Sequence, residues 1–521
     1  MLLYYGKNAP SSREELLTRM SIQQLVAVDT EAEAGELLVL AMAWSPDDAV
    51  AFSPDEVPFQ VLGSFPTIFH NCLYDMEVIE KNLNITMNNV AGDTMLAAQT
   101  LGYPAALGEL APIFNFPWKP VTSLLYEVGQ VKKARKSLKQ CALQDVGVIC
   151  CEHAMATFSI WNSLRGKVGA SYQQDMRLVP VLYKMHQHGI RVDTSLVEKN
   201  YAETKAEADF IKQTALGRGY SPVSNLLIGM YLSQLGVYTG LTPTGKMKTD
   251  RASLLPFKHL YDVALILQHR KISKLTSTYL RPSLHKSRQY PHYHIVSTGR
   301  LASSEPNIQN IPPLIRDIYI PDDGDYFLDV DFSQIEPTVA AYLSQDPDLI
   351  QAVNTGDVYQ PIADRLGISR DDAKVSWLAI SYGAGAELLS DRLDITEEEA
   401  DTLRNDIFAA YPVFYHWTRK VIQQAEQAGY TTTLLGRKRV MLGQERDAPN
   451  TKIQGTASEI LKDVMILLDD HAKIVASVHD ELLLSVPLGS TVPLAALIPS
   501  VWHGIPWRYA VKTGASYAAL Q

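Results

Sequence analysis

The chain has 521 residues, of which 46% are hydrophobic and 20% are charged, and its formal net charge is −10. This length predicts two to four domains with more than one hydrophobic core, and the composition is that of a soluble globular protein. The acidic balance does not by itself suggest a nucleic-acid partner, because binding a polyanion would require local basic patches beside acidic metal sites.

The cysteines and the hydropathy of the chain indicate the cellular compartment in which the protein is expected. The four cysteines, Cys72, Cys141, Cys150 and Cys151, have a spacing that fits neither a zinc ribbon nor a disulfide framework, which favours a reducing compartment. The first twenty residues reach charge too early for a signal peptide, and no apolar run has the length of a membrane span. We therefore expect a soluble cytoplasmic protein that does not bind a membrane.

Residues 1–165 have the pattern of an α/β unit. Apolar runs predict strands at 25–29, 37–44 and 67–69, and helical periodicity follows at 75–83, 93–101 and 137–164. The small and polar stretch 165–171 (RGKVGAS) is typical of a linker.

The rest of the chain is mostly helical until residue 430. The predicted helices span 172–188, with Gly189 ending the first of them, and then 196–215, 252–284 and much of 346–430. Thr396, with Glu399 three residues later, predicts a capped start for the helix Glu397–Ala410. Residues 431–521 return to strands with one helix.

Two apolar runs are interrupted by carboxylates, LDVDFSQIE (328–336) and SVHDELLLSV (477–486). Strands of this composition are normally buried, and a buried carboxylate must be paired, hydrogen-bonded or bound to a metal. Asp331 and Asp480 are therefore candidates for a site that holds two Mg²⁺ ions about 3.5–4 Å apart, as in phosphoryl displacement. Each motif alone is equally compatible with turn or edge residues on solvated strands.

Between these runs, a helix over 369–385 would place Arg370, Lys374, Leu378 and Tyr382 on one face. Such a face could hold a triphosphate, pack on a sugar and meet a base. For an isolated helix, a solvated basic face is the simpler interpretation.

Five ordered motifs resemble those of family A DNA polymerases, the bacterial and phage replication and repair enzymes, across residues 172–521. They are TGRLASSEPNIQNIP (298–312), DFSQIE (331–336), R-x₃-K-x₇-YG (370–383), N-x₃-QG (450–455) and HDE (479–481). The resemblance implies that Asp331, Asp480 and the main-chain carbonyl of Phe332 hold two Mg²⁺ ions, with Mn²⁺ as a substitute and Glu481 as a helper.

The resemblance also assigns nucleotide and DNA contacts. It implies that Lys374 and Arg370 bind the triphosphate, that Glu336 excludes a 2′-hydroxyl, and that Gln334 and Leu378 also contact the nucleotide. Tyr382 and Gly383 would bracket the template base. The residues expected to contact primer-template DNA are Arg300, Asn307, Gln309, Arg446, Asn450, Gln454 and His479.

Some positions depart from the family pattern. Pro337-Thr338 replaces the usual Leu-Arg and requires a different helix entry, and the C-terminal Trp position is Tyr517. Asp329 shares a strand face with Asp331 but is not used by the family motif, so we expect a solvent or salt-bridge role for it.

The N-terminal carboxylates resemble a DEDD 3′→5′ exonuclease domain. Asp29 and Glu31 at the end of a strand, Asp75 in a helix and Asp145 in a late helix would hold two metal ions and activate a water. Cys141 stands where the family has a Tyr, and a thiol is a weaker hydrogen-bond donor. We expect an active exonuclease; the alternative is a degraded domain kept as a scaffold.

The sequence therefore predicts a multidomain protein of the α/β and α+β classes: a ribonuclease-H-like exonuclease domain (1–165) and a right-hand polymerase domain (172–521). The thumb would span about 195–290, the fingers about 346–430 and the palm the remainder. We expect a monomeric DNA polymerase, of phage or bacterial replication, that uses primer-template DNA and dNTPs. Its alternatives are a 3′→5′ exonuclease whose C-terminal half binds DNA without polymerising, and a non-catalytic primer-template binding protein. Glu336 disfavours an RNA polymerase.

Overall fold

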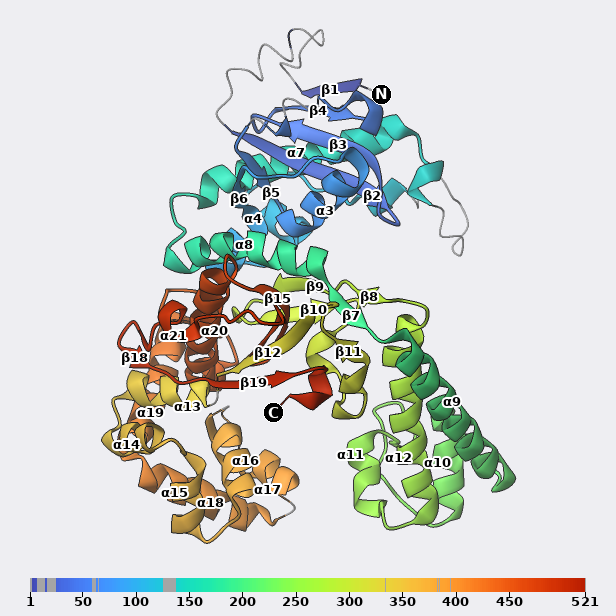
Figure 1. Ribbon diagram of the computed structural model, residues 1–521, viewed down its shortest axis with the longest axis vertical. Helices are drawn as coiled ribbons and strands as arrows, with labels where there is room; N and C mark the ends of the chain where they lie inside the picture. The colour runs from blue at the N-terminus through green and yellow to red at the C-terminus, as the bar shows by residue number, and fades with distance from the viewer. Residues whose placement is uncertain are drawn as a thin grey trace.

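The computed structural model describes residues 2–6, 15, 25–58, 62–63, 65–124, 137–332, 334–381, 383, 385–393 and 395–520. The chain has the mixed α/β multidomain architecture predicted from the sequence, with a sheet-containing N-terminal unit, a central sheet and two helical groups that extend to opposite sides (Figure 1).

A six-stranded sheet forms the core of the N-terminal unit. Its spatial order is β1 (Leu2–Gly6), β4 (Asp48–Phe52), β3 (Glu36–Ala43), β2 (Val26–Glu33), β5 (Thr67–Phe69) and β6 (Val90–Asp93). The pairs from β1 to β2 are antiparallel, whereas β2, β5 and β6 run parallel. Helix α7 (Leu143–Leu164) packs on β2, β3 and β4, so these strands are buried and read as nearly continuous apolar runs.

The sequence located this unit's central strands but missed three others. β1, β4 and β6 were not predicted, because each is short and lacks a bounded alternating pattern. The expectation that Asp29 and Glu31 close a strand is wrong, since β2 continues to Glu33 and both carboxylates lie within it.

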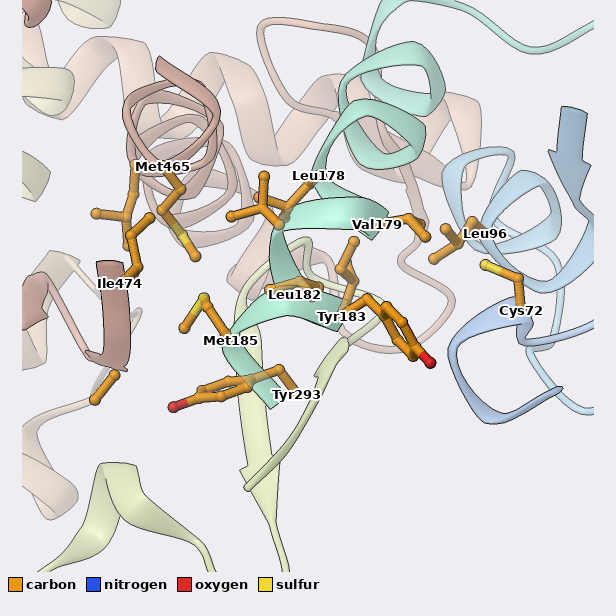
Figure 2. Close-up of a cluster of buried hydrophobic side chains, with 14 of the residues drawn as sticks. Cys72, Leu96, Leu178, Val179, Leu182, Tyr183, Met185, Tyr293, Met465 and Ile474 are labelled. Atoms are coloured by element: carbon orange, nitrogen blue, oxygen red, sulfur yellow. The ribbon is translucent and has the colours of Figure 1, made fainter. Parts of the chain in front are cut away.

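Helix α8 (Ala170–His188) joins the N-terminal unit to the central sheet. Figure 2 shows its apolar side chains between Cys72 and Leu96 on one side and Met465 and Ile474 on the other. Leu178 and Leu182 are at most 1% exposed. The helix is therefore a shared core element, and a single hydrophobic cluster runs through both units.

The central sheet is antiparallel and four-stranded. Its order is β15 (Lys473–Val478), β16 (Glu481–Pro487), β12 (Asp325–Asp331) and β19 (Ala510–Gly514). Helices α13 (Ile335–Ser344) and α20 (Ala448–Leu468) pack together beside it. Pro337 lies in the first turn of α13, where backbone N–H groups have no intrahelical partner, so its missing donor leaves the helix intact.

One helical group has its own small core, separate from the main cluster. It contains α9 (Thr194–Gly217), α10 (Asn225–Gln234), α11 (Arg251–Leu254) and α12 (Tyr261–Lys274). The helix predicted over 252–284 is divided at Pro256, where the ring prevents a continuous helix, and it continues beyond α12 as a π-helical segment, Leu275–Leu280. Helix α10 was not predicted.

The second group contains the helices predicted over 346–430. They are α14 (Pro347–Thr355), α15 (Tyr359–Leu366), α16 (Arg370–Ser381), α17 (Ala386–Leu393), α18 (Glu397–Ala410) and α19 (Pro412–Ala428). The capping box of α18 is confirmed: the Glu399 N–H donates to Thr396 Oγ1 at 3.2 Å, and the Thr396 N–H donates to the Glu399 carboxylate at 2.8 Å.

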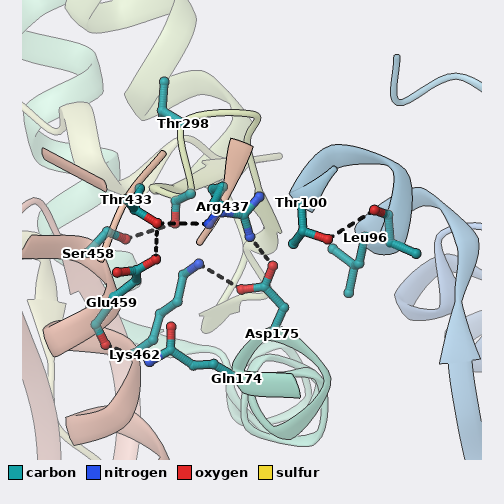
Figure 3. Close-up of polar contacts among 12 residues, drawn as sticks. Leu96, Thr100, Gln174, Asp175, Thr298, Thr433, Arg437, Ser458, Glu459 and Lys462 are labelled. Atoms are coloured by element: carbon teal, nitrogen blue, oxygen red, sulfur yellow. Dashed lines mark hydrogen bonds and ion pairs between the residues drawn. The ribbon is translucent and has the colours of Figure 1, made fainter. Parts of the chain in front are cut away.

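A buried ion cluster holds α8 against α20. Asp175 is fully buried; Lys462 Nζ donates to its Oδ1 at 2.8 Å, and the guanidinium of Arg437, in the turn between β13 (Tyr430–Thr432) and β14 (Lys438–Val440), bonds its Oδ2 (Figure 3). Gln174 of α8 adds a hydrogen bond of 2.8 Å to the Glu459 carbonyl of α20. The Asp175 carboxylate thus links α8 to the β13–β14 turn and to α20, both of which lie more than 250 positions further along the chain.

Within the described residues, no helix is both long and apolar enough to cross a membrane.

Asp175→Ala should lower the free energy of unfolding by about 3–5 kcal/mol, because it leaves two buried cations without their counterion. Chemical denaturation measures this loss. The matched control is Glu203→Ala on the exposed surface of α9, which should change stability by no more than about 0.5 kcal/mol. Equal effects of the two variants would show that the buried cluster is not needed for stability.

Candidate active site

The central sheet brings the two acidic motifs together. The register of β12 and β16 places Asp331 opposite Glu481. A two-residue turn, His479-Asp480, joins β15 to β16, with His479 at φ 54°, and the Phe332 N–H donates to the Asp480 carbonyl at 2.9 Å. Asp331 and Asp480 therefore lie at the same end of the sheet, although 148 positions separate them.

A cavity of about 810 Å³ opens at this end. It is lined by residues from all five motifs: Arg300, Gln309, Asp331, Phe332, Gln334, Glu336, Arg370, Lys374, Leu378, Gln454, His479, Asp480 and Glu481. The structure thus gathers the carboxylates, the basic helix face and several predicted DNA contacts around one space.

Negative charge accumulates beside this cavity. Burial raises the pKa of Asp480 to about 6, with a further increase from the charges of Glu336 and Asp331, against the opposing charge of Arg300. Among the described residues, the oxygens of Asp331, Asp480 and Glu481 do not all converge within 4.8 Å. Carboxylates that serve two ions about 3.5–4 Å apart need not converge on one point. An oxygen donor set with excess negative charge fits Mg²⁺ or Mn²⁺.

Asp329 does not have the predicted exposure to solvent. It is 1% exposed, and burial raises its pKa to about 7, with Glu481 adding to the shift. Lys512 of β19 lies between two carboxylates, 3.4 Å from Asp331 Oδ2 and 3.9 Å from Asp329 Oδ2. The salt-bridge part of the expectation therefore agrees with the geometry, and Lys512 is a site neighbour that the sequence did not indicate.

The face of α16 is turned toward the cavity as the helical spacing predicts. Arg370, Lys374 and Leu378 all line the cavity. Arg370 Nε donates to Asp357 Oδ2 at 2.7 Å, which holds its guanidinium near the Tyr359 ring, 5.6 Å from the ring centroid. The fourth member of the face, Tyr382, lies outside the described residues.

Two further lining residues are held in place by specific contacts. Glu336 is 7% exposed and forms an ion pair with Arg300 at the cavity wall. Gln334 accepts a hydrogen bond from the Val358 N–H and donates to the Gly356 carbonyl, both at 2.9 Å, which ties it to the loop between α14 and α15. The Phe332 carbonyl accepts a 3.3 Å bond from the Ile335 N–H and has a second lone pair for a metal ion.

The other residues predicted to contact DNA do not line the first cavity. Gly383 and Arg446 line a second cavity, of about 930 Å³, beside α19. Asn307 is exposed near Ser303 Oγ, at 3.5 Å. Asn450 lines neither cavity, and among the described residues its buried Oδ1 has no hydrogen-bond partner.

The C-terminal segment also reaches the site. Tyr517 is 4% exposed, its hydroxyl donates to Glu481 Oε2 at 3.2 Å, and its ring lies 4.7 Å from the guanidinium carbon of Arg316. In the sequence, only the aromatic residue at the position of the family Trp indicated a role for Tyr517. Its partner Glu481 became clear only from the fold.

A second carboxylate cluster lies in the N-terminal unit. Asp29 and Glu31 on β2 face the ring of His153 on α7, whose Nδ1 is 3.8 Å from Asp29 Oδ2 and 3.1 Å from Glu31 Oε1. Burial lowers the pKa of His153, but the Glu31 hydrogen bond and the Asp29 charge outweigh it and raise the pKa to about 9. Asp75 Oδ1 accepts bonds from Thr30 Oγ1 at 2.6 Å and from the Thr30 N–H at 3.1 Å.

The fourth predicted carboxylate is placed differently. Asp145 is exposed in the first turn of α7, and it is not part of the close group that Asp29, Glu31 and His153 form among the described residues. His153, two turns further along the same helix, occupies the place beside Asp29 and Glu31. His153 was not predicted from the sequence, because no local motif marks it and only an i+8 spacing on the same helix relates it to Asp145.

Comparison with known proteins agrees with this architecture. The fold is that of a solved structure titled "POL domain of Pol1 from M. smegmatis complex with DNA primer-template and dNTP", with a TM-score of 0.80, 24% sequence identity and 98% coverage of both chains. The family model for DNA polymerase family A matches residues 198–518. The chain belongs to DNA polymerase family A, as the five motifs predicted.

Curated relatives extend the match. DNA polymerase I of Chloroflexus aurantiacus is 28% identical over 569 residues, covering 94% of this chain and 60% of that protein. The thermostable DNA polymerase I of Thermus filiformis is 32% identical over 377 residues, covering 63% of this chain and 45% of that protein. The chain spans about half the length of the curated relatives it matches.

The raised pKa of Asp480 gives a testable pH dependence of metal binding. Its pKa in the folded protein, about 6, exceeds the ordinary value of 3.8. The folded protein therefore loses stability as the pH rises from about 4 to about 6, because the buried carboxyl must ionise. A metal ion offsets this loss only at a pH where the carboxyl is charged. We expect Mg²⁺ to raise the unfolding temperature more at about pH 7.5 than at about pH 5. Scanning calorimetry of wild type and Asp480→Asn measures this; a pH-independent gain, or one retained fully in the variant, contradicts it.

Proposed function

We propose that the protein is a template-directed DNA polymerase that adds dNMP from dNTPs to the 3′ end of a primer. The observation that carries this proposal is the single cavity at which Asp331 and Asp480 of the central sheet face Arg370 and Lys374 of α16. Hydrolysis would need the carboxylates alone, whereas a basic helix face opposite them suits a nucleoside triphosphate.

The cationic residues of α16 bind the triphosphate. Arg370 is oriented by Asp357, and Lys374 is exposed on the same face and lines the same cavity, so both can contact phosphate oxygens of a triphosphate bound there. Lys374 would also donate a proton to the leaving pyrophosphate. Family membership supports these roles, because both residues lie within the matched range 198–518 and the resemblance to the family's motifs assigns them to the triphosphate.

Asp331, Asp480 and the Phe332 carbonyl would hold two Mg²⁺ ions, or Mn²⁺ as a substitute, with Glu481 as a helper. Bound metal ions lower the pKa of the primer 3′-hydroxyl and neutralise charge on the transferring phosphate. The chain's own part is to fix these donors: the β12–β16 register and the Phe332–Asp480 hydrogen bond position the ligands, and Tyr517 orients Glu481.

Sugar and DNA recognition follow from the cavity wall. Glu336 is buried and paired with Arg300 at this wall, and in our proposal it would lie beneath the nucleotide sugar and exclude a 2′-hydroxyl. Gln309, Gln454 and His479 line the same space and present polar groups to the primer-template duplex. Such contacts tolerate every correct base pair, because minor-groove acceptors are similar for all of them.

Asp331→Ala should abolish primer extension, with a loss of at least about 1,000-fold, since several kcal/mol of charge stabilisation disappear at about 1.4 kcal/mol per tenfold. The assay is extension of a labelled primer by dNTPs with Mg²⁺. Asp323→Ala is the control, because the Asp323 side chain is 89% exposed and does not line the candidate active-site cavity. Primer extension retained by Asp331→Ala would contradict the role of Asp331 as a metal ligand of the polymerase site. Digestion without extension by wild type would favour the exonuclease alternative, and binding without either reaction would favour the non-catalytic one.

A second activity, 3′→5′ proofreading, is proposed for the N-terminal unit. The observation that favours it is the placement of Asp29, Glu31 and Asp75 around one part of β2, with burial raising the pKa of Asp29 to about 7. These carboxylates would hold the metal ions, and the imidazolium of His153 offsets their charge when no metal is bound. The four cysteines are free, which agrees with a reducing, cytoplasmic setting for both activities. We also propose that the protein acts as a monomer, because one chain contains both candidate sites.

Asp29→Ala should abolish removal of a mismatched 3′ nucleotide in the absence of dNTPs, while extension of a matched primer continues at the wild-type rate. The same labelled primer reads both reactions. Wild-type protein that leaves the mismatched end intact would show that this unit is a scaffold without nuclease activity.

A further inference from the structure

Two histidines and a glutamate meet at the boundary between the N-terminal unit and the two-stranded sheet of β9 (His292–Ile295) and β10 (Leu301–Ser304). Glu77 lies on α3 (Cys72–Leu83), His186 lies in the last turn of α8, and His292 begins β9 (His292–Ile295). All three line a cavity of about 570 Å³ that is separate from the candidate active site.

The three donor atoms have the spacing of ligands to one small ion. Glu77 Oε2 is 3.6 Å from His186 Nε2 and 3.3 Å from His292 Nδ1, and all three atoms lie within 4.8 Å of one another. Metal–ligand bonds of about 2.0–2.1 Å in a tetrahedron place neighbouring ligands about 3.3 Å apart. The observed separations are therefore close to the edges of such a polyhedron.

The tautomer of His186 is set by a backbone group. His186 Nδ1 lies 3.1 Å from the Pro291 carbonyl and donates to it, so Nε2 presents its lone pair to the space beside Glu77. A ligating histidine normally has this arrangement, with the second ring nitrogen bonded to a carbonyl or carboxylate. The rings of His186 and His292 stack at 4.4 Å with an interplanar angle of 25°, which turns both toward the same carboxylate.

We propose that Glu77, His186 and His292 form a binding site for one first-row transition-metal dication of the Zn²⁺ type, which ties α3 to α8 and β9. Two imidazoles and one carboxylate favour such an ion over Mg²⁺ or Ca²⁺, which prefer oxygen ligands. The side chains of Glu77 and His292 are 35% and 42% exposed, which leaves room for water as a fourth ligand.

Such an ion would stabilise the junction of the two units, because it would bind only when the three elements are assembled. This role differs from the proposed polymerase and nuclease chemistry, which uses other residues and oxygen-rich donor sets. The group Asp29, Glu31 and His153 is the other candidate among the described residues, so an experiment must separate the two.

The test is Zn²⁺ binding to the full chain, measured by competition with a chelating indicator in excess Mg²⁺, which occupies the carboxylate sites. His186→Ala, His292→Ala and Glu77→Gln should each weaken Zn²⁺ binding by more than about 100-fold, since even the outer partners of metal ligands contribute about 10–100-fold. His285→Ala is the matched control, because His285 forms a similar 3.2 Å pair with Glu198 on the surface but lacks a second imidazole.

Two further measurements keep the result decisive. Co²⁺ should give the visible absorption of a low-coordinate N/O site in wild type and in His153→Ala, but not in His186→Ala. In excess Mg²⁺, Zn²⁺ should raise the unfolding temperature of wild type and leave that of Glu77→Gln, a variant of unchanged shape, at its Zn²⁺-free value. Absence of tight Zn²⁺ binding to wild type, or binding lost in His153→Ala rather than in His186→Ala, would overturn the proposal.

Discussion

The buried carboxylate of Asp175 is the constraint on which the arrangement of the chain depends. A fully buried charge is stable only with its counterions in place, and these come from Arg437 and Lys462, more than 250 positions away. The cluster therefore fixes α8 against α20, while the apolar face of α8 packs on the N-terminal unit. Helix α8 also packs on β15 of the sheet that holds Asp331 and Asp480, so the apolar contacts of α8 and the ion cluster support that sheet (Figures 2 and 3).

The active-site sheet has the opposite electrostatic character. Asp175 is neutralised internally, whereas Asp480, Glu481, Asp331 and Asp329 leave an excess of negative charge that Lys512 only partly offsets. Burial raises the pKa of Asp329 and Asp480, so ionising these carboxyl groups is unfavourable unless a cation lies close to them. The chain thus contains one carboxylate that is paired with two cations and one group of partly buried carboxylates that retains excess negative charge.

Patterns local in sequence were sufficient for part of this description. The spacing of Arg370, Lys374 and Leu378 defined a helix face that the structure turns toward the cavity, and the Thr396–Glu399 pattern identified a capped helix start. Pairings between distant segments were not accessible in the same way. His153 stands beside Asp29 because α7 packs across β2, and Lys512 stands beside Asp331 because β19 pairs with β12. Asp145 has a family spacing, yet its helix leaves it exposed, since spacing does not fix the angle at which a helix meets a sheet.

The sequence by itself determined the family, the order of the motifs and the residue types that metal and triphosphate chemistry requires, because these depend on short-range patterns and on the cost of burying charge. The tertiary structure alone decided that Asp329 and Asp331 share the ammonium of Lys512, how Tyr517 reaches Glu481, and that Glu77 meets His186 and His292. Those contacts arise where elements distant in the chain pack together, and packing angle and register are set by the whole core rather than by any one segment.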